Sequence, residues 1–212
     1  ENDRGLNTGG MGAYAPTPIL SKSELSNIRK EIIEPTIDEL IKRKIVYKGV
    51  LYFGLMITKS GPKVIEYNCR FGDPECQTIM PLMDINFVNI LYKCASGNLN
   101  GDEKVLSTSK VSGCVIASSK GYPENYDVGY PISFNYDEHE DIQIFHSGTS
   151  VNKEGEIITN GGRVLSVVCQ GKDFDSAFIT AYKVLKSIYF DGIYYRKDIG
   201  HQVRTNYSYE DL

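Results

Sequence analysis

The sequence has no apolar run near the roughly 20 residues that a membrane-spanning helix needs, so we expect no membrane partner. It has no excess of basic charge either. The net charge of -4 and the pI near 5.5 argue against a nucleic-acid partner. No CxxC or HxxxH spacing offers a zinc site. The five cysteines are odd in number and lack close pairing, which predicts reduced, packed thiols and a cytoplasmic protein.

An initiating methionine and a signal peptide are also absent, and the chain starts at Glu1 in a polar run. We therefore expect that a preceding segment has been removed. What is present is ordinary for a globular protein, with 41% hydrophobic and 24% charged residues in 212. A chain of this length can bury a sizeable core, as one large domain or two small ones.

The most informative stretch runs from Lys63 to Gln77, and its first half reads as a strand after the Gly61-Pro62 turn. Since side chains alternate along a strand, one face should carry Glu66, Asn68 and Arg70, and the packed face Ile65, Tyr67 and Cys69. A carboxylate, a carboxamide and a guanidinium in one row can hold a hard cation beside an anion. A structural salt-bridge ladder explains the same spacing, and the spacing leaves both interpretations open.

The second half of this stretch predicts a helix start. Asp73 is a suitable N-cap, Pro74 suits the first helical position, and Glu75 lies favourably in the first turn. A strand end that turns into a helix is where α/β proteins commonly bind ligands. Asp73 and Glu75 are therefore either capping residues or substrate contacts.

Residues 1–18 are predicted to form a loop. Gly9, Gly10 and Gly12 would let backbone N–H groups approach an anion, and Asn7 and Thr8 add polar groups. No Gly-Lys-Ser/Thr follows, so it is not a Walker loop.

The other elements predict an α+β protein. A capping box at Ser21–Glu24 should open a helix to about Arg43 that Pro35 kinks or divides. The apolar strand within Tyr47–Ile57 should be buried on both faces and pair antiparallel with the Glu66 strand. Further helices are expected at Pro74–Met83, Asn86–Ala95 and from Asp173 to about Ser187, and further strands at Val111–Ala117, Gln143–His146, Glu156–Thr159 and Arg163–Cys169. The polar stretch 97–108 is the candidate domain boundary, and the chain from His201 reads as a tail or linker.

Five motifs in order carry a resemblance to a known family: Asn7–Tyr14, Val64–Gln77, His146–Thr149, Asn160–Leu165 and Arg196–Gly200. Together they resemble the phosphoribosylamine–glycine ligases, also called glycinamide ribonucleotide synthetases, which are ATP-grasp enzymes of de novo purine biosynthesis. The resemblance covers residues 1–200. It implies an ATP-grasp-type antiparallel sheet with helices over residues 1–105, a small mixed C-terminal domain over 106–200, and a tail over 201–212.

The resemblance implies that ATP, glycine and 5-phosphoribosylamine give glycinamide ribonucleotide, ADP and phosphate through a glycyl phosphate. Glu66 and Asn68 would then hold Mg2+ or Mn2+ on the ATP phosphates, and Arg70 would be catalytic. The substrate-binding residues would be Asn7, Thr8, Gly9, Gly10, Met11 and Gly12, together with Asp73 and Glu75.

The chain departs from the family pattern in three places. Residues 52–57 offer no acidic metal ligand, Leu6 stands where proline is frequent, and the amino-terminal half is missing before Glu1. We therefore expect the isolated chain to be inactive. Cys76 resembles the eukaryotic form, in which aminoimidazole ribonucleotide synthetase follows in the same multifunctional chain. Two alternatives stay open: another ATP-grasp ligase or carboxylase, and a non-catalytic assembly module.

Overall fold

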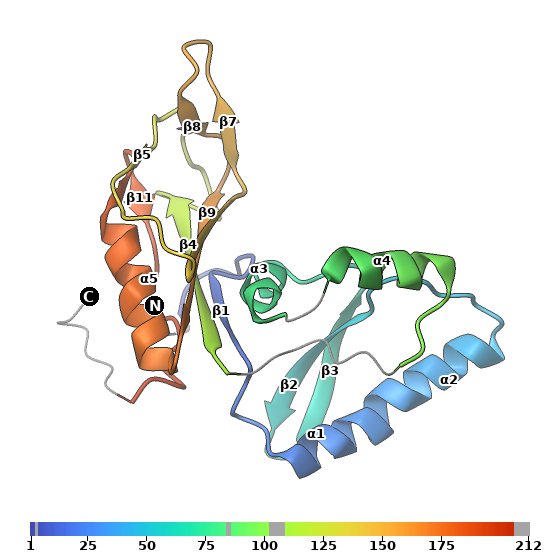
Figure 1. The fold of residues 1–212 in the computed structure, drawn as a ribbon. Coiled ribbons are helices and arrows are strands. Elements are labelled where there is room, and N and C mark those ends of the chain that lie inside the picture. Colours follow the sequence, from blue (N-terminus) through green and yellow to red (C-terminus); the bar gives the residue numbers. More distant parts are fainter. Residues whose placement is uncertain (3, 84–85, 102–108, 206–212) are drawn as a thin grey trace. The chain divides into compact units, whose positions relative to one another are not determined.

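A computed structural model of the chain describes residues 1–212 except 3, 84–85, 102–108 and 206–212 (Figure 1). The chain forms two compact units. The sheet–helix unit comprises Glu1–Pro16, Asp73–Met83 and Ser107–Leu212, and the hairpin unit comprises Thr17–Gly72 and Asp84–Leu106. The expected domain division at 105/106 stays a prediction.

The sheet–helix unit is built on a five-stranded antiparallel sheet. Its order is β1 (Gly12–Ala15), β4 (Val111–Ser119), β9 (Arg163–Gly171) and β6 (Ile142–His146), and β11 (Ile193–Tyr194) also pairs with β4. The strands expected near β4, β6 and β9 are confirmed. Residues 12–15, expected as loop, form β1 instead, because β4 offers them a partner from Ser112 to Val115.

One face of this sheet packs against α5 (Phe174–Lys186), which Figure 1 shows running alongside β4 and β9. Since alternate residues of a strand share a face, Val115, Val167 and Cys169 point to this core. The core also receives Phe178, which is fully buried. The helix expected from Asp173 to about Ser187 is confirmed.

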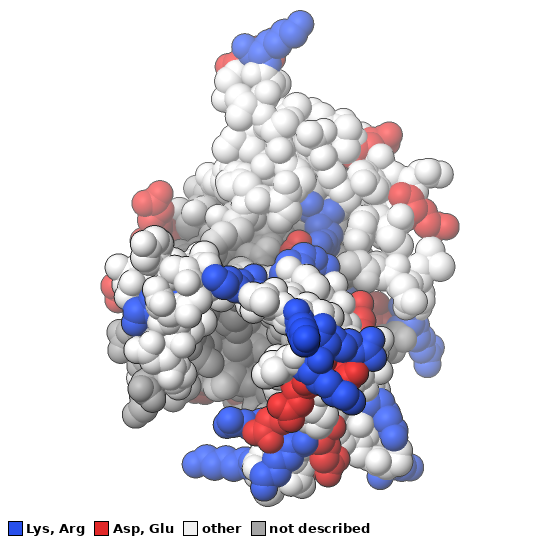
Figure 2. Space-filling view, turned by 90° about the vertical axis from the view of Figure 1, so that its right-hand side faces the viewer, with Lys and Arg blue, Asp and Glu red and all other residues white. Residues whose placement is uncertain are grey.

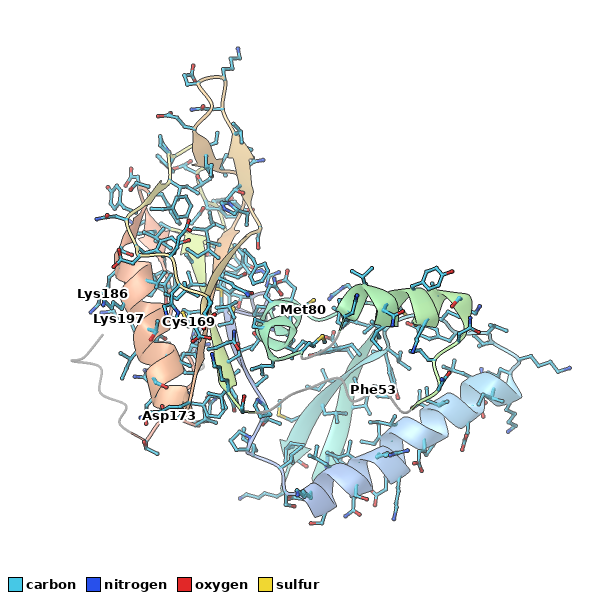
Figure 3. All side chains as sticks on the ribbon, in the orientation of Figure 1. Phe53, Met80, Cys169, Asp173, Lys186 and Lys197 are labelled. Carbon is cyan, nitrogen blue, oxygen red and sulfur yellow. The ribbon has the colours of Figure 1, made fainter. Side chains whose placement is uncertain are left out.

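Asp173, where this helix was expected to start, is its N-cap. Asp173 accepts a hydrogen bond from the backbone N–H of Ser176, and the Ser176 hydroxyl completes a capping box. Figure 3 labels Asp173 at one end of α5 and Lys186 at the other. An acidic first turn and a basic last turn both suit the helix dipole.

The opposite face of the sheet holds a smaller cluster of Met11, Cys114, Ile116 and Val168. The short helices α3 (Glu75–Ile79) and η2 (Met80–Leu82) pack on this side of β4, and α3 also contacts β1. Two small antiparallel pairs complete the unit: β7 (Thr149–Val151) with β8 (Ile157–Thr159), and β10 (Ile188–Tyr189) with β5 (Ser133–Phe134).

The expected tail beginning at His201 is wrong for its first residues. Arg204 is only 8% exposed, and its guanidinium carbon lies 5.9 Å from the ring centroids of both Phe178 and Tyr182. A cation above aromatic faces is stabilising, so this segment belongs to the fold. The remainder of the predicted linker, 206–212, lies outside the described residues.

The hairpin unit contains β2 (Tyr52–Thr58) and β3 (Gly61–Asn68), which pair antiparallel as predicted. Its helices are α1 (Lys22–Ile28), α2 (Glu34–Lys42) and α4 (Phe87–Ser96), with a π-helical turn, η1 (Arg29–Ile33), between α1 and α2. The Ser21–Glu24 capping box is confirmed. Pro35 in the first turn of α2 has no N–H to donate, and the turn before it widens so that the Glu34 N–H bonds to the Arg29 carbonyl.

The prediction that β2 is buried on both faces is wrong, and so is the prediction that Ile65, Tyr67 and Cys69 lie on a packed face. Met56 is 53% exposed and Ile65 is 62% exposed. Ile65 sits at a β-bulge, where the register skips from Glu66 to Val64. A groove of about 530 Å³, lined by α2 residues together with Val64 and Tyr67, lies beside the same strand.

The described residues contain no helix with the length and apolarity to cross a bilayer. On the face drawn in Figure 2, acidic and basic side chains lie side by side. The described residues also include ion pairs such as Arg29–Glu34 and Arg43–Glu39.

Candidate functional site

The first candidate group is the set of Glu66, Asn68 and Arg70 at and after the end of β3, which we call the polar row. It belongs to the hairpin unit. Asn68 donates from Nδ2 to Oε1 of Glu66 at 2.9 Å. Gly54 pairs with Glu66, and a Cβ at Gly54 would lie 2.9 Å from Glu66 Cγ, so glycine leaves room for this side chain. The bond uses one carboxylate oxygen and the amide nitrogen, which leaves Oε2 of Glu66 and Oδ1 of Asn68 as acceptors.

This pair of oxygens fits a hard cation, because Mg2+ and Mn2+ are bound by carboxylate and carboxamide oxygens. The described residues hold no cluster of three or more His, Cys, Asp or Glu side chains suited to a metal. Glu66 and Asn68 could therefore supply two ligands of a cation whose remaining ligands are phosphate oxygens or water. Mg2+ at phosphate sites commonly has such a shell.

Arg70 does not continue the row on the strand. The last residue pair of the hairpin is Tyr52 with Asn68, so strand geometry and its alternation end there. Arg70 lies in the following bend, is exposed, and donates from one terminal nitrogen to the Phe71 carbonyl at 2.8 Å. The prediction of three residues on one strand face is therefore wrong for Arg70, and its catalytic role stays a prediction.

The second group is the glycine loop, Asn7–Gly12, in the sheet–helix unit. Its two ends differ in burial. Met11 is buried at 7% exposure, and its carbonyl accepts from the Ile116 N–H at 3.0 Å. Gly12 lies in β1, where a Cβ would meet Ile199 Cγ2 at 2.4 Å. Met11 and Gly12 thus hold the loop to the sheet.

The other end of the loop is open to solvent. Asn7, Thr8, Gly9 and Gly10 are exposed, and the side chains of Asn7 and Thr8 make no hydrogen bond within the described part of the chain. The Gly9 N–H donates to the Tyr122 hydroxyl at 3.0 Å. The exposed end carries the groups that could contact a ligand.

Asp73 is not the helix cap that the sequence predicted. Pro74 occupies the cap position of α3 and makes no side-chain capping bond. The Asp73 carboxylate instead pairs with Arg163, whose NH2 lies 2.7 Å from Oδ2 and whose NH1 lies 3.2 Å from Oδ1. It also accepts from Gln77 Nε2 at 2.9 Å. A two-pronged guanidinium partner outcompetes an N-cap bond that would satisfy one backbone N–H.

Arg163 also reaches the glycine loop. Its NH1 donates to the Gly10 carbonyl at 3.1 Å and to the Asp73 carbonyl at 3.0 Å. One guanidinium therefore joins three segments: the glycine loop, the turn before α3 and the start of β9. Gly10 and Asp73 lie 153 and 90 residues from Arg163 in the sequence. A Cβ on Gly10 would lie 2.5 Å from Pro74 Cδ, so the loop can approach this turn only as glycine.

Further glycines let the neighbouring turns pack around Arg163. A Cβ on Gly148 would lie 2.6 Å from the Arg163 carbonyl, and one on Gly162 would lie 2.2 Å from the Tyr122 ring. Ser119 fixes the same turn through its backbone N–H to the Gly162 carbonyl, 2.8 Å. We call Gly9, Gly10, Asp73, Tyr122 and Arg163 the Arg163 cluster.

Arg163 and Tyr122 were not predicted as site residues. Tyr122 follows a glycine and precedes a proline, and Arg163 opens β9 directly after Gly161 and Gly162, so turns of an antiparallel hairpin explain both positions without any ligand. The available signal was a lone arginine after two glycines. Glu75, in the first turn of α3, is half-buried, and its role stays a prediction.

Elsewhere in the same unit, Asp198 is a strongly perturbed carboxyl. Asp198 is 2% exposed and pairs with the Arg196 guanidinium, which holds its pKa well below the usual range. The Asn2 N–H also donates to Asp198 at 2.8 Å. Burial raises the pKa of both Cys114 and Cys169 to about 12. The prediction of packed thiols is confirmed for these two buried cysteines and is wrong for Cys69, which is exposed.

Two models of one protein family match the chain. The Phosphoribosylglycinamide synthetase ATP-grasp (A) domain matches residues 1–76, and the Phosphoribosylglycinamide synthetase C domain matches residues 112–202. The chain belongs to the phosphoribosylglycinamide synthetase family. The resemblance read from its motifs is thereby confirmed, and so are its α+β class and its ATP-grasp fold.

Members of the phosphoribosylglycinamide synthetase family align over nearly the whole chain. Phosphoribosylamine--glycine ligase of a Synechocystis strain is 47% identical over 95% of this chain and 48% of its own length. The Bifunctional purine biosynthetic protein ADE1 of Schizosaccharomyces pombe is 43% identical over 95% of this chain and 25% of its own. The crystal structure of Phosphoribosylamine--glycine ligase from Thermotoga maritima matches with a TM-score of 0.82 and 32% identity, over 94% of this chain and 49% of that one. The chain spans about half the length of the curated single-function relatives it matches.

Proposed function

We propose that this chain forms part of an ATP-dependent ligase that joins glycine to 5-phosphoribosylamine, giving glycinamide ribonucleotide, ADP and phosphate in purine biosynthesis. The observation that carries the proposal is the 47% identity to a phosphoribosylamine–glycine ligase over 95% of the chain. The reaction requires that a crowded polyphosphate be neutralised and that three substrates be oriented. The polar row and the Arg163 cluster offer groups for these two tasks.

The polar row would serve ATP. Oε2 of Glu66 and Oδ1 of Asn68 would hold Mg2+ or Mn2+, and the cation, when bound, would neutralise charge on the phosphates. Arg70 would stabilise the transferring phosphoryl group or the glycyl phosphate, because its fork fits phosphate oxygens. Among the described residues, the one hydrogen bond of the Arg70 side chain is an exposed bond to the Phe71 carbonyl, which Arg70 would give up to bind an anion.

The Arg163 cluster would serve the other substrates. Arg163 fixes the carbonyl of Gly10 and the carboxylate of Asp73, while the Tyr122 hydroxyl fixes the N–H of Gly9. With the backbone held in this way, the exposed side chains of Asn7 and Thr8 would contact glycine or the ribose phosphate. Asp73, held in place by its ion pair with Arg163, would then contribute to substrate binding.

We extend the proposal to the surroundings of the chain. Catalytic turnover would require the part of the relatives' sequence, about half of their length, that this chain does not span. Bifunctional and trifunctional purine proteins among the relatives support fusion to a following enzyme, which we propose to be aminoimidazole ribonucleotide synthetase. The five free cysteines favour the cytoplasm.

The test is formation of glycinamide ribonucleotide by the full-length protein, with fresh phosphoribosylamine. We expect Arg70→Ala and Glu66→Gln each to lower kcat by about 100-fold or more while the fold is retained, as is typical when a group that stabilises transferring charge is lost. Glu66→Gln should also raise the Mg2+ concentration needed for half-maximal rate. Lys63→Gln, on the same strand, is the matched control and should keep near-normal activity. If the unsubstituted full-length protein forms no product, the proposed reaction is wrong.

A further inference from the structure

Ser119, the last residue of β4, is buried at 3% exposure and bonds to two separate turns. Its N–H donates to the Gly162 carbonyl at 2.8 Å, and its hydroxyl donates to the Gly161 carbonyl at 2.8 Å. Its own carbonyl accepts from the Tyr122 N–H at 3.2 Å. Ser119 therefore joins the turn that follows β4 to the turn that precedes β9.

These two turns carry the side chains that hold the glycine loop. The Tyr122 hydroxyl accepts from the Gly9 N–H at 3.0 Å, and Arg163 donates to the Gly10 carbonyl at 3.1 Å. The turns also pack on each other, because a Cβ on Gly162 would lie 2.2 Å from the Tyr122 ring. The ring and the guanidinium that hold the loop thus start from one packed pair of turns.

A β-bulge gives Arg163 its direction. In the pairing of β4 with β9, Ala117 lies opposite Leu165, but the next residue, Ser118, lies opposite Arg163. Val164 is therefore an extra residue, and both Val164 and Leu165 belong to the core that contains α5. Without the extra residue, Arg163 would share the core face with Leu165, two positions later. The bulge turns Arg163 away from this core, and it reaches the glycine loop instead.

We propose that Ser119 is a positioning residue for the glycine loop, acting through Tyr122 and Arg163. Because β9 begins at Arg163, the two glycines before it lie outside the strand ladder, and Ser119 supplies the donors to both of their carbonyls. Ser119 is too deeply buried to contact a substrate itself. Its effect on substrate binding rests on the proposed function, in which the loop contacts glycine or the ribose phosphate.

Ser119→Ala removes the donor to the Gly161 carbonyl and keeps the backbone bonds of residue 119. The turn gains freedom while the strand is retained, so Arg163 and Tyr122 no longer hold the loop in one place. Since a misplacement of about 1 Å can cost about 100-fold, we expect KM to rise about tenfold for glycine, for 5-phosphoribosylamine or for both. The KM for ATP, which the polar row would serve, should stay within about twofold, and kcat should fall by less than about twofold.

The neighbouring residue supplies a matched control. Ser118 is 1% exposed, and its hydroxyl also donates to a backbone carbonyl, that of Tyr194 in β11, at 3.2 Å. Ser118→Ala therefore loses the same kind of bond at the same depth, but at β11 and not at the turn before Arg163. If Ser119 only stabilised the fold, the two alanine variants would behave alike.

The first measurement needs no activity and uses the full-length protein with isotopic nitrogen in its glycines. In the amide spectrum, Ser119→Ala should shift the Gly9 and Gly10 signals, whereas Ser118→Ala should leave both in place. If these two signals stay unchanged in Ser119→Ala, or move equally in Ser118→Ala, Ser119 does not position the loop and the proposal is wrong.

The second measurement is the rate of product formation at varied concentrations of each substrate. Ser119→Ala should raise KM for glycine or 5-phosphoribosylamine and spare KM for ATP, and Ser118→Ala should spare all three. If the Gly9 and Gly10 signals move and every KM is unchanged, the effect on substrate binding is wrong. If the unsubstituted full-length protein forms no product, the proposed reaction fails, and the amide spectra still decide the role of Ser119.

Discussion

The Arg163 cluster allows a quantitative prediction, because one side chain makes four hydrogen bonds to two distant segments. Arg163 bonds to the Gly10 carbonyl, the Asp73 carbonyl and both Asp73 carboxylate oxygens. Hydrogen bonds to charged groups contribute about 1.5–3 kcal/mol each when they are well shielded. Here the side chains are 22% and 42% exposed, and NH1 is shared among three acceptors, so the sum must be reduced.

We therefore expect Arg163→Ala to lower the free energy of unfolding of the sheet–helix unit by about 2–4 kcal/mol. Arg163→Lys should cost about half as much, because an ammonium group keeps the charge and cannot bridge Asp73 and Gly10 as a planar fork does. Asp73→Asn should remove the charge but keep an acceptor. A double-mutant cycle with Arg163→Ala and Asp73→Asn should then give a coupling energy of about 1–2 kcal/mol.

Because the chain has two units, a single two-state fit is unsuitable. The measurement is hydrogen exchange of the Gly9 and Gly10 amides, combined with urea unfolding followed by a probe in the sheet–helix unit. Arg43→Lys is the matched control, since Arg43 pairs with Glu39 at 68% and 46% exposure and should change stability by less than about 0.5 kcal/mol. The reasoning is refuted if Arg163→Lys has no larger effect than Arg43→Lys.

Three further substitutions test other parts of the sheet–helix unit. Asp198→Asn should lower the free energy of unfolding at pH 7 by about 2–4 kcal/mol, because it removes the charge from the buried pair with Arg196. Since the folded-state pKa of Asp198 is depressed, its ionised form stabilises the fold above about pH 4. In urea unfolding at a series of pH values, the difference in free energy of unfolding between Asp198→Asn and the unsubstituted chain should shrink below that pH; a constant difference would contradict this. Gly200→Ala should cost about 2–4 kcal/mol, because Gly200 has φ +80° and a Cβ would lie 2.2 Å from the Phe178 ring; an unchanged Tm would contradict this. Phe178→Ala should cost about 3–5 kcal/mol through the cavity it leaves, and a loss below about 1 kcal/mol in urea unfolding would show that the core can close over it.

The parts of the fold that could be predicted from sequence are those set by local rules. The capping boxes at Ser21 and Asp173 begin helices where the spacing predicted them, since a capping box needs only four consecutive residues. The helix expected from Asp173 and the strand expected at Val111–Ala117, observed as Val111–Ser119, also followed from local pattern. The family motifs predicted the fold because five of them occur in the same order as in the family, which makes the match specific.

The failures share a different cause, which is a partner distant in sequence. Residues 12–15 became a strand because β4, about 100 residues later, offers an edge. Asp73 was drawn from the helix cap to Arg163, 90 residues away. A propensity scale cannot weigh such a partner, because local and tertiary hydrogen bonds compete for the same oxygen atoms.

The polar row shows how strand alternation can be extended too far. Alternation correctly placed Glu66 and Asn68 together, and their side chains are 2.9 Å apart. Arg70 was included on the assumption that the strand continued. The outermost pair between β2 and β3 is Tyr52 with Asn68, so β2 offers no partner opposite Arg70. The extent of β2 therefore decides where the row stops, and the spacing of residues along β3 does not encode that extent.

The interleaving of the two units along the chain has a consequence for cutting the protein. The polypeptide passes between the units four times, after Pro16, Gly72, Met83 and residue 106. A single protease cut at any one of these passages therefore leaves the units covalently joined through the remaining three. A truncation at residue 106 would also strand β1 and α3 without the sheet they complete. Experiments that replace or express one unit alone should therefore treat the hairpin unit as two insertions, 17–72 and 84–106, and keep the three segments of the sheet–helix unit together.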